Sequence, residues 1–433
     1  MTKQPPFSDV ITLCRELVAI DSINPFAAYQ RPDQSWHIEG QEDEIFAYCR
    51  EWLERADCEV TMQDCGGGRF NLLAEKGTGE VSLLLYAHVD TVEVKDGWTR
   101  EQALSCSSAL RDVDGRTQEV LIGLGANDMK GGLAVLLRAI ALYTPTHYKL
   151  KLALGCDEEF WSLGSQCLIE SSFLDDVIGI IVPEVGESTV DPAPDVSLVT
   201  LGRCGRVEFV VDVPGSGGHG AEPEAEGRVN AITQASRIAL AIESFSARLP
   251  ALQPFEESPQ KVKASALVTS LQGGTGTLSI PDKATLIVNR VLNSGETIDE
   301  AQRQLEDLIQ SLYDDESLQT LSDGRRVSVS IRERPTPPMS PYLLSPSQPF
   351  IKEVLSVLRQ HTPVELGMGL SVADENRFGG QARKPVLVLG PRGEDSHAPF
   401  EWVTKDSLIK LEALYLHILK HFDQISLDLP RSI

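Results

Sequence analysis

The sequence predicts an α/β fold in which a domain with a mostly parallel sheet is interrupted by a smaller α+β domain. At 433 residues the chain is longer than a single hydrophobic core usually supports. Strand and helix patterns alternate over the first half, which is typical of a parallel sheet. The alternation stops near residue 207 and returns after a proline-rich stretch at 334–346. We therefore expect a discontinuous main domain at 1–200 and 336–433, with the inserted domain at 201–335.

The elements of the first part follow from the spacing of its apolar residues. Helical spacing predicts helices at 7–20, 40–56 and 131–143. Strands are predicted at 81–87, 149–155 and 177–182, and the first and last of these are near-continuous apolar runs. Such runs are typical of strands that are covered on both faces of a sheet.

The inserted segment has a different order of elements. We expect strands at 207–213, 264–271, 284–292 and 326–331, and helices at 226–245 and 297–313. Thr297 and Glu300 have the spacing of a capping box at the start of the second helix. In chain order this is a βαββαβ unit, the ferredoxin-like α+β arrangement. The α/β alternation then resumes with a helix at 348–361, a strand at 385–389 and a helix at 404–422.

The charge of the chain argues against two classes of partner. It carries 39 basic and 63 acidic residues, a net charge of −24. A field of that sign repels phosphate backbones and anionic lipid, so we expect no nucleic-acid and no membrane binding. The start of the sequence lacks the basic and apolar regions of a secretory signal, and the eight cysteines include no Cys-x-x-Cys pair. We therefore expect reduced thiols and a cytoplasmic protein.

The first candidate site residues, His88 and Asp90, stand where the predicted strand at 81–87 ends. Residues two apart on a strand point to the same face, so both can be aimed at one point. Ligands commonly gather beyond the carboxyl ends of strands in sheets of this kind. A metal-bound imidazole usually donates its second N–H to a neighbouring group, and the Asp90 carboxylate is placed to accept it.

Three more acidic residues occupy comparable positions. Asp128 lies in the turn that leads into the helix at 131–143, where a carboxylate can either bridge two cations or cap the helix. Glu158 and Glu159 follow the strand at 149–155. Successive carboxylates repel one another unless cations or exposure relieve them, so these two belong either to a metal site or to a solvated loop.

Glu184 and His397 complete the set, because they follow the predicted strands at 177–182 and 385–389. Each residue alone is a weak signal, but four strands of one sheet each lead to a histidine or a carboxylate. Two histidines and three carboxylates suit two zinc ions, which take imidazole and oxygen ligands. Two such ions can polarise a carbonyl and lower the pKa of a water, and a spare carboxylate can then carry the proton.

Motifs of other enzyme classes are missing. The sequence contains no His-Glu-x-x-His, no Gly-x-Ser-x-Gly and no phosphate-binding loop. An NAD-dependent oxidoreductase is disfavoured because the Gly-x-Gly-x-x-Gly fingerprint is incomplete. A metal-binding or peptide-binding protein that has lost catalysis would lack a ligand or a base, and neither is missing.

The candidate residues belong to an ordered series of motifs that runs nearly from end to end. It consists of His88-Val-Asp90, Asn127-Asp-Met-Lys-Gly-Gly132, Asp157-Glu-Glu159, Pro183-Glu184, His219, and Ser396-His397 followed by Glu401-Trp402-Val403. This series resembles the metallopeptidase and aminoacylase family that includes acetylornithine deacetylase, succinyl-diaminopimelate desuccinylase and glutamate carboxypeptidase. The inserted βαββαβ unit is similar to the lid domain of that family.

The resemblance implies a role for each site residue. His88 and Glu184 would hold one zinc ion, Glu159 and His397 would hold the other, and Asp128 would bridge them. Glu158 would act as general base, and Asp90 would orient His88.

The resemblance also implies substrate-binding residues and a homodimer formed through the lid domain. His219 would stabilise the developing oxyanion across the dimer interface, and Arg290 would bind a substrate carboxylate, with Arg377 as a further candidate. The sequence departs from the family pattern at Leu278 and Val288, and also at Phe160 and Trp161, where small residues are frequent. These departures leave the metal chemistry intact and concern the identity of the substrate.

We therefore predict a metal-dependent hydrolase that cleaves the amide bond of a small, carboxylate-bearing N-acyl amino acid. The implied cofactors are two divalent metal ions, with zinc favoured over cobalt or manganese. A dipeptidase or carboxypeptidase acting on small peptides is the nearest alternative, because the same metals attack either amide.

Overall fold

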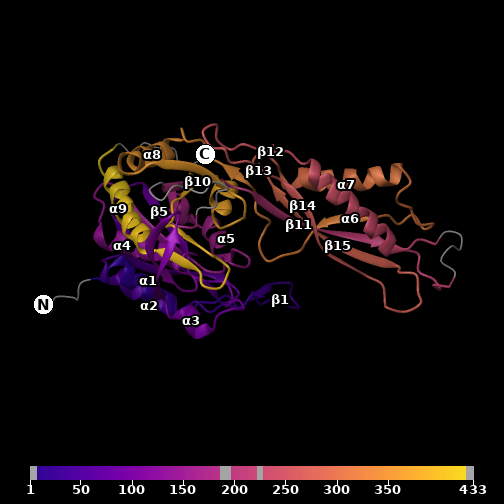
Figure 1. Cartoon of the computed structure of the whole chain (residues 1–433), viewed down its shortest axis with the longest axis horizontal. Helices are drawn as coiled ribbons and strands as arrows, with labels where there is room; N and C mark the ends of the chain where they lie inside the picture. The colour runs from indigo at the N-terminus through magenta and orange to yellow at the C-terminus, as the bar shows by residue number, and fades with distance from the viewer. Residues whose placement is uncertain (1–6, 186–196, 222–227, 426–433) are drawn as a thin grey trace. The chain divides into compact units, whose positions relative to one another are not determined.

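The computed structural model describes residues 7–185, 197–221 and 228–425, and these divide into two compact units (Figure 1). The larger unit comprises Met1–Gly202, Leu343–Gly369 and Ala373–Ile433. The second unit comprises Arg203–Tyr342 and Leu370–Val372. The larger unit is therefore discontinuous in sequence, and the second unit is inserted into it.

The larger unit is built on a nine-stranded sheet with the strand order β17-β10-β19-β9-β5-β8-β4-β3, in which β18 pairs with β10. The strands at its centre are β19 (Val386–Val388), β9 (Val177–Val182), β5 (Ser82–His88) and β8 (Lys149–Gly155). These four run parallel to one another, and β5 and β9 are buried along their whole length. The outer strands are β17 (Tyr342–Leu343), β10 (Ser197–Arg203), β18 (Val364–Gly369), β4 (Arg69–Gly77) and β3 (Glu59–Gly66).

The sheet is mixed, so the prediction of a mostly parallel sheet is correct only for its centre. β4 runs antiparallel to both β8 and β3, and β10 runs antiparallel to β19. The edge strand β3 is largely exposed and carries no continuous apolar run, which is why apolar spacing did not predict it. It joins β4 through glycines 66, 67 and 68, which all have positive φ angles that favour glycine.

Helices cover the sheet, and most of them end within a few residues of their predicted bounds. They are α1 (Val10–Ala19), α2 (Asp43–Arg55), α3 (Arg100–Leu104), α4 (Lys130–Leu142), α5 (Leu163–Ile169), α8 (Pro349–His361) and α9 (Lys405–Phe422). The apolar helix α4 packs against α1, α2 and α9 and is buried on nearly all sides. Two short turns of other helix types lie at Ser172–Leu174 and Asn376–Gln381.

A second, four-stranded sheet has the order β20-β21-β7-β6 and was not predicted. It consists of β6 (Ser107–Val113), β7 (Arg116–Ile122), β20 (Gly393–Glu394) and β21 (Trp402–Thr404). The pairing of β20 with β21, and of β21 with β7, fixes both ends of the loop that carries His397. Two small two-stranded sheets are formed by β1 (Ala28–Gln30) with β2 (Trp36–Ile38) and by β12 (Ala251–Leu252) with β13 (Val262–Lys263).

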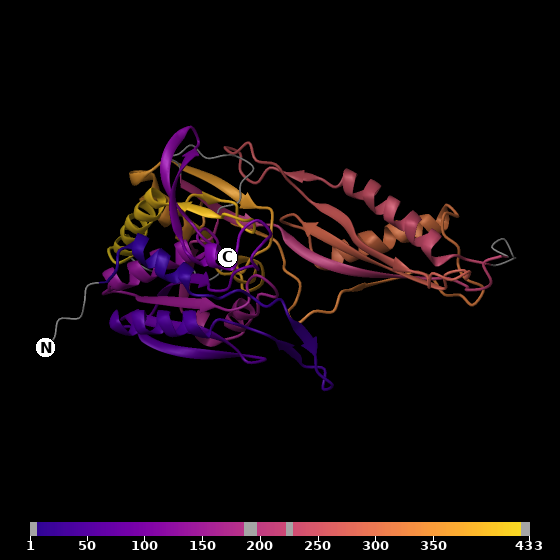
Figure 2. The ribbon, with the colours of Figure 1, turned by 60° about the horizontal axis from the view of Figure 1, so that its bottom comes forward.

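The inserted unit has the predicted βαββαβ order of elements. Its strands β11 (Gly205–Pro214), β14 (Ser265–Gly273), β15 (Lys283–Leu292) and β16 (Ser328–Ile331) form an antiparallel sheet with the order β14-β15-β11-β16. Helices α6 (Ala231–Arg248) and α7 (Ile298–Asp314) pack against each other and against this sheet (Figure 2). Thr297 and Glu300 form the predicted capping box of α7. Asn230 caps α6, so this helix begins later than predicted; part of the predicted start, 226–227, lies outside the described residues.

Two further features concern the cysteines and the helices. All eight cysteines are free thiols. Within the described part of the chain, none of the helices combines the length and apolar character needed to cross a membrane.

Candidate metal centre

Three neighbouring parallel strands bring most of the candidate residues to one edge of the large sheet. His88 is the last residue of β5, Glu158 and Glu159 follow β8, and Glu184 follows β9. Since β5 pairs in parallel with both β8 and β9, the carboxyl ends of all three strands meet at the same edge. Asp128 reaches this edge from the turn before α4.

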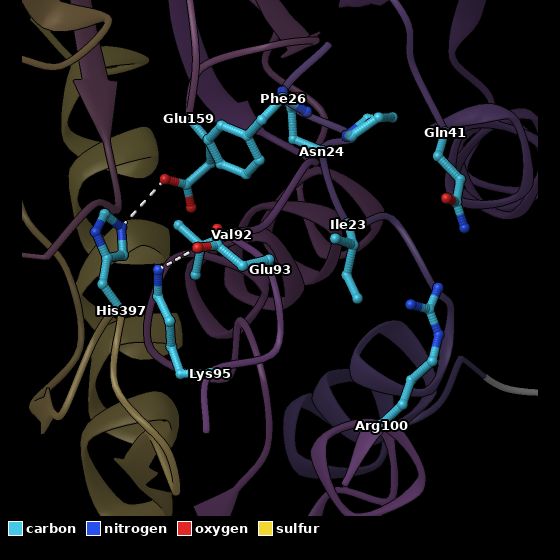
Figure 3. Close-up of a pocket in the computed structure, with 11 residues that line it drawn as sticks. Ile23, Asn24, Phe26, Gln41, Val92, Glu93, Lys95, Arg100, Glu159 and His397 are labelled. Atoms are coloured by element: carbon cyan, nitrogen blue, oxygen red, sulfur yellow. Dashed lines mark hydrogen bonds and ion pairs between the residues drawn. The ribbon is translucent and has the colours of Figure 1, made fainter. Parts of the chain in front are cut away.

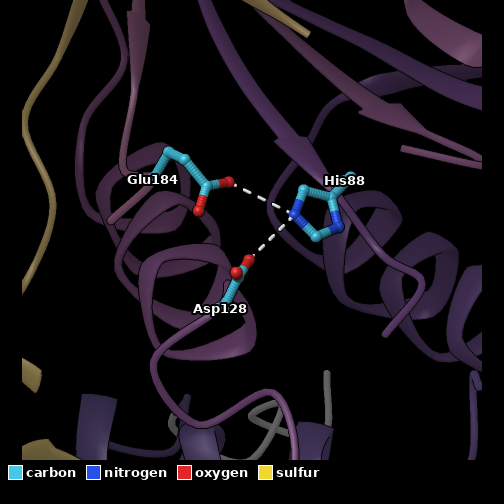
Figure 4. A group of neighbouring side chains, drawn as sticks. All are labelled: His88, Asp128 and Glu184. Carbon is cyan, nitrogen blue, oxygen red and sulfur yellow. Dashed lines mark hydrogen bonds and ion pairs between the residues drawn. The ribbon is translucent and has the colours of Figure 1, made fainter. Parts of the chain in front are cut away.

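The first group of converging side chains is formed by His88, Asp128 and Glu184 (Figure 4). The Nε2 atom of His88 lies 3.2 Å from Asp128 Oδ1 and 3.2 Å from Glu184 Oε2. Only 2% of the His88 side chain is exposed. The group is therefore enclosed, and two carboxylates face one ring nitrogen.

The second group is formed by Asp128, Glu159 and His397. The Nε2 atom of His397 lies 3.1 Å from Glu159 Oε2 and 3.4 Å from Asp128 Oδ2 (Figure 3 shows the contact with Glu159). The two oxygens of Asp128 thus face different groups, Oδ1 the first and Oδ2 the second. Glu159 is 3% exposed, whereas 54% of the His397 side chain is exposed. The second group is therefore the one that solvent reaches.

The donor set of the two groups fits two divalent cations. Imidazole nitrogen and carboxylate oxygen are ligands that zinc accepts. Glu159 Oε1 is buried and has no hydrogen-bond partner, which is costly unless a cation sits beside it. Burial, together with the nearby Asp128 carboxylate, raises the pKa of Glu184 to about 8 and that of Glu159 to about 7. The hydrogen bonds to Asp128 and Glu159 raise the pKa of His397 to about 11. A bound cation would favour the charged form of both glutamates and the neutral form of His397, and would therefore oppose all three shifts.

A carboxylate to which the sequence analysis gave no role, Glu401, holds the turn that carries Asp128. Glu401 Oε1 accepts the backbone N–H groups of Asn127 and Asp128, both at 2.8 Å, and Oε2 accepts that of Gly125 at 3.0 Å. The N-cap of α4 is Met129, without a side-chain cap, so the alternative in which Asp128 caps the helix is wrong. The sequence signal available for Glu401 was its place in the motif series, directly before Trp402 and Val403.

Asp90 contacts both His88 and the loop that carries the two glutamates. His88 Nδ1 lies 3.0 Å from the backbone oxygen of Asp90 and 3.6 Å from its carboxylate. The carboxylate also accepts the backbone N–H groups of Glu158 at 3.1 Å and Glu159 at 3.2 Å. It also accepts an N–H of the buried Asn24 at 2.9 Å. Asp90 therefore fixes His88 through its backbone and the glutamate loop through its side chain.

The three successive carboxylates after β8, those of Asp157, Glu158 and Glu159, have different surroundings. Asp157 is fully buried and accepts hydrogen bonds from Asn24 at 3.0 Å and from Arg69 at 3.4 Å, while Arg69 also pairs with Glu42. Glu158 belongs to neither metal-ligand group. Burial raises the pKa of Glu158 well above its usual range. The charge of His88 lowers this pKa, and the surrounding carboxylates raise it. Asn24 and Arg69 are polar, so the spacing of apolar residues gave no indication that they are buried.

None of the three predicted substrate-binding residues belongs to either metal-ligand group. His219, in the inserted unit, is exposed, and its Nδ1 accepts the N–H of Ala221 at 3.2 Å. Arg290, on β15 of the same unit, is only 2% exposed and pairs with Glu296 at 2.5 Å and with Gln304 at 3.2 Å. Arg377 is fully buried in the larger unit and donates to Gln381 at 2.7 Å. The guanidinium groups of both arginines thus have partners within their own unit.

Residues 84–421 match the Peptidase family M20/M25/M40. The chain belongs to this family. The match confirms the family that the motif series predicts. The acetylornithine deacetylase of Aliivibrio fischeri strain MJ11 is 32% identical over 251 residues, which make up 57% of this chain and 58% of that enzyme. The chain thus matches only a little over half the length of this curated relative.

Solved structures have the same fold as the whole chain. An M20 family metallo-carboxypeptidase from Sulfolobus solfataricus superposes with a TM-score of 0.70 at 15% identity, over 97% of this chain and 100% of that one. A dinuclear metal-binding peptidase of the M20 family from Bacillus subtilis superposes with a TM-score of 0.65 at 15% identity, over 95% of this chain and 97% of that one. At these identities the likeness concerns the fold alone.

Proposed function

We propose that this M20 family protein hydrolyses the amide bond of a small N-acyl amino acid with the help of two divalent metal ions. The observation that carries the proposal is the division of the two Asp128 oxygens between two His-and-carboxylate groups, with Glu158 beside them as a carboxylate outside both groups. The likeness to acetylornithine deacetylases supports an N-acyl amino acid as substrate.

In the proposed mechanism, His88, Asp128 and Glu184 would hold one ion, and Asp128, Glu159 and His397 would hold the other. When bound, the ions would polarise the scissile carbonyl and lower the pKa of a water. The carboxylate of Glu158 is placed to accept a proton from the attacking water and to pass it to the leaving nitrogen. Asp90 holds Glu158 and Glu159 in register through their backbone N–H groups, so the proton carrier and a metal ligand keep a fixed separation.

A substrate panel tests the proposal. The purified protein is loaded with zinc, cobalt or manganese and is given N-acetyl and N-succinyl amino acids alongside dipeptides and tripeptides. We expect N-acyl amino acids to be hydrolysed with the highest kcat/KM. Faster hydrolysis of dipeptides or of carboxy-terminal residues would favour the dipeptidase or carboxypeptidase alternative, and no amide hydrolysis with any metal would refute the proposal.

Zinc is the proposed metal because the donor set combines imidazole and carboxylate ligands, with cobalt or manganese as substitutes. We further propose that the protein acts in the cytoplasm. The eight free thiols support this proposal, because such thiols persist in a reducing compartment.

The substrate carboxylate and the oxyanion are proposed to be bound by side chains beyond the metal ligands. The resemblance supports His219 as the oxyanion donor, and the exposed position of its ring leaves it accessible. It also supports Arg290 and Arg377 as partners of the substrate carboxylate. For Arg290 this role requires that its contacts with Glu296 and Gln304 be exchanged for the substrate.

We also propose that the protein forms a homodimer through the inserted unit. Strand β14 is an edge of its sheet, and an edge strand offers unpaired backbone groups to a second copy. Beside it a hollow of about 460 Å³ is lined by residues of α6 and β14. Leu240 and Leu267 are among these residues and are exposed.

Sedimentation equilibrium tests the dimer. The wild type should sediment as a dimer at micromolar concentration, and the double variant Leu240→Glu with Leu267→Glu should sediment as a monomer. Leu110→Glu, which alters an exposed leucine of β6 in the larger unit, serves as the control. A monomeric wild type would contradict the proposal.

A further inference from the structure

A cavity of about 770 Å³ in the larger unit opens beside the second metal-ligand group. Two of the residues that line it are the ligands Glu159 and His397 (Figure 3). Its volume is in the range of sites that hold a small molecule, and it is many times larger than an acetyl group. The apolar part of the lining is formed by Ile23, Phe26 and Val92, and the polar part includes Asn24, Gln41, Glu93, Lys95 and Arg100. Ile23 and Val92 belong to a packed apolar cluster that supports the cavity wall.

Phe26 is held in this wall in a conformation that aromatic residues rarely adopt. Its φ angle is 52°, in the left-handed region, which costs free energy unless the surroundings fix it. Its N–H donates to Asn24 Oδ1 at 2.9 Å, and Asn24 Nδ2 donates to Asp90 at 2.9 Å and to Asp157 at 3.0 Å. The network that fixes the glutamate loop therefore also fixes the aromatic ring beside it.

Two further aromatic side chains continue the wall behind Phe26. The ring centroid of Phe26 lies 5.4 Å from that of Phe160, and the centroid of Phe160 lies 4.5 Å from that of Trp161. Phe160 directly follows the metal ligand Glu159 in the sequence. The departure from small residues at 160 and 161 thus builds an aromatic surface next to the site.

The cations of the cavity are already neutralised. Lys95 pairs with Glu93 at 2.5 Å, and Arg100 pairs with Asp21 outside the cavity lining. In Figure 3 Arg100 lies away from Glu159 and His397. The acidic side chains of Glu93 and Glu159 also line the cavity and repel a further carboxylate, whereas an uncharged apolar group meets no such repulsion.

We propose that this cavity binds an uncharged, apolar group of the substrate that is larger than acetyl, and that Phe26 determines the preference for it. The inference rests on the proposed amide hydrolysis and narrows its substrate class. The apolar group is attached either to the acyl side or to the amino-acid side of the scissile amide, and the two sources are separated by experiment.

The experiment measures kcat/KM of the zinc-loaded enzyme on two series. One series varies the acyl group of one amino acid through acetyl, butanoyl, hexanoyl, phenylacetyl and succinyl. The other keeps acetyl and varies the amino acid through glycine, alanine, leucine and phenylalanine. We expect kcat/KM to rise about fourfold for each buried methylene in one of the series. Succinyl should gain less than twofold over acetyl.

Variants of Phe26 test whether the aromatic wall causes the rise of kcat/KM with the size of the apolar group. Phe26→Ala should reduce the preference for the larger apolar groups by about tenfold. Phe26→Leu, which retains apolar bulk, should keep the aliphatic preference but lose the preference for phenyl groups. Tyr29→Ala removes a nearby exposed aromatic residue that does not line the cavity, and should leave the preferences unchanged.

Binding of free acids and amino acids, measured by calorimetry, provides a readout that does not need turnover. If the enzyme is active but kcat/KM rises in neither series, the inference is overturned and the proposed function stands. A Phe26→Leu variant with wild-type preferences would have the same consequence. Graded binding without hydrolysis of any amide would overturn the proposed function and leave the cavity assignment standing. Flat binding without hydrolysis would overturn both.

Discussion

The two units of the molecule place their charged side chains in different ways. In the larger unit, His88, Glu159 and Glu184 stand at or just beyond strand ends, where the sheet has no further residue to cover them. In the inserted unit, Arg290 stands within β15, opposite Val207 of β11 and Ala266 of β14. Glu296 and Gln304, which lie just before α7 and within it, enclose its guanidinium. At the strand ends the buried side chains converge on one another and can share a ligand, whereas the position within a covered strand gives Arg290 partners of its own.

The comparison predicts its largest effect at Glu158. Glu158→Gln should lower kcat by about 10²–10⁴, because it removes a positioned proton carrier and keeps the shape of the side chain. Metal content, measured by elemental analysis, should remain that of the wild type, because Glu158 is in neither ligand group. Turnover within a few-fold of the wild type would show that the proton is carried elsewhere.

His219 tests whether the inserted unit contributes to catalysis at all. His219→Ala should lower kcat by about 10²–10³, the usual effect of losing one oxyanion donor, without changing metal content. Mixing this variant with Glu158→Gln should restore activity if the histidine acts across a dimer. Unchanged kcat in His219→Ala would remove the residue from the mechanism.

Arg290 separates a structural role from a substrate-binding role. Arg290→Met should lower the free energy of unfolding by about 1–3 kcal/mol, because Glu296 and Gln304 lose a buried partner. Denaturant titration measures this loss, and the proposed contact with the substrate also predicts a selective loss of kcat/KM on substrates with a free carboxylate. A less stable variant whose kcat/KM is unchanged on those substrates would leave Arg290 with a structural role alone.

An effect of similar size is expected at Glu401. Glu401→Gln replaces an oxygen that accepts backbone N–H groups of the Asp128 turn, and should weaken metal binding about tenfold to hundredfold. Competition with a chelator measures the affinity. Glu394→Gln, which alters an exposed carboxylate paired with Arg392, is the control. Equal metal affinity in the two variants would contradict the role given to Glu401.

Part of this arrangement could be predicted from sequence because it depends on local pattern. Apolar runs located β5 and β9, and the parallel direction of the strands then placed the residues beyond them at one edge. Arg290 carries a similar signal: Ala284, Leu286, Val288 and Leu292 share its strand phase and are all buried. That phase alone indicates a buried arginine with an internal partner.

Other features could not be predicted, because they depend on contacts between distant segments. Glu401 meets the turn of Asp128 from more than two hundred and seventy positions away in the chain. The edge strand β3 is exposed and polar, so its pairing with β4 left no apolar signature. Asn24 acts through two buried carboxylates, Asp90 and Asp157, that come together only in the folded sheet.

Metal stoichiometry tests the central claim most directly. Protein dialysed to equilibrium with zinc and analysed for bound metal should contain two ions per chain, because the structure offers two ligand groups that share Asp128. Asp128→Ala should fall below one ion per chain under the same conditions, since each group loses a ligand. A well-folded wild type that saturates at one ion or fewer, or an Asp128→Ala variant that retains two, would contradict the shared two-metal site.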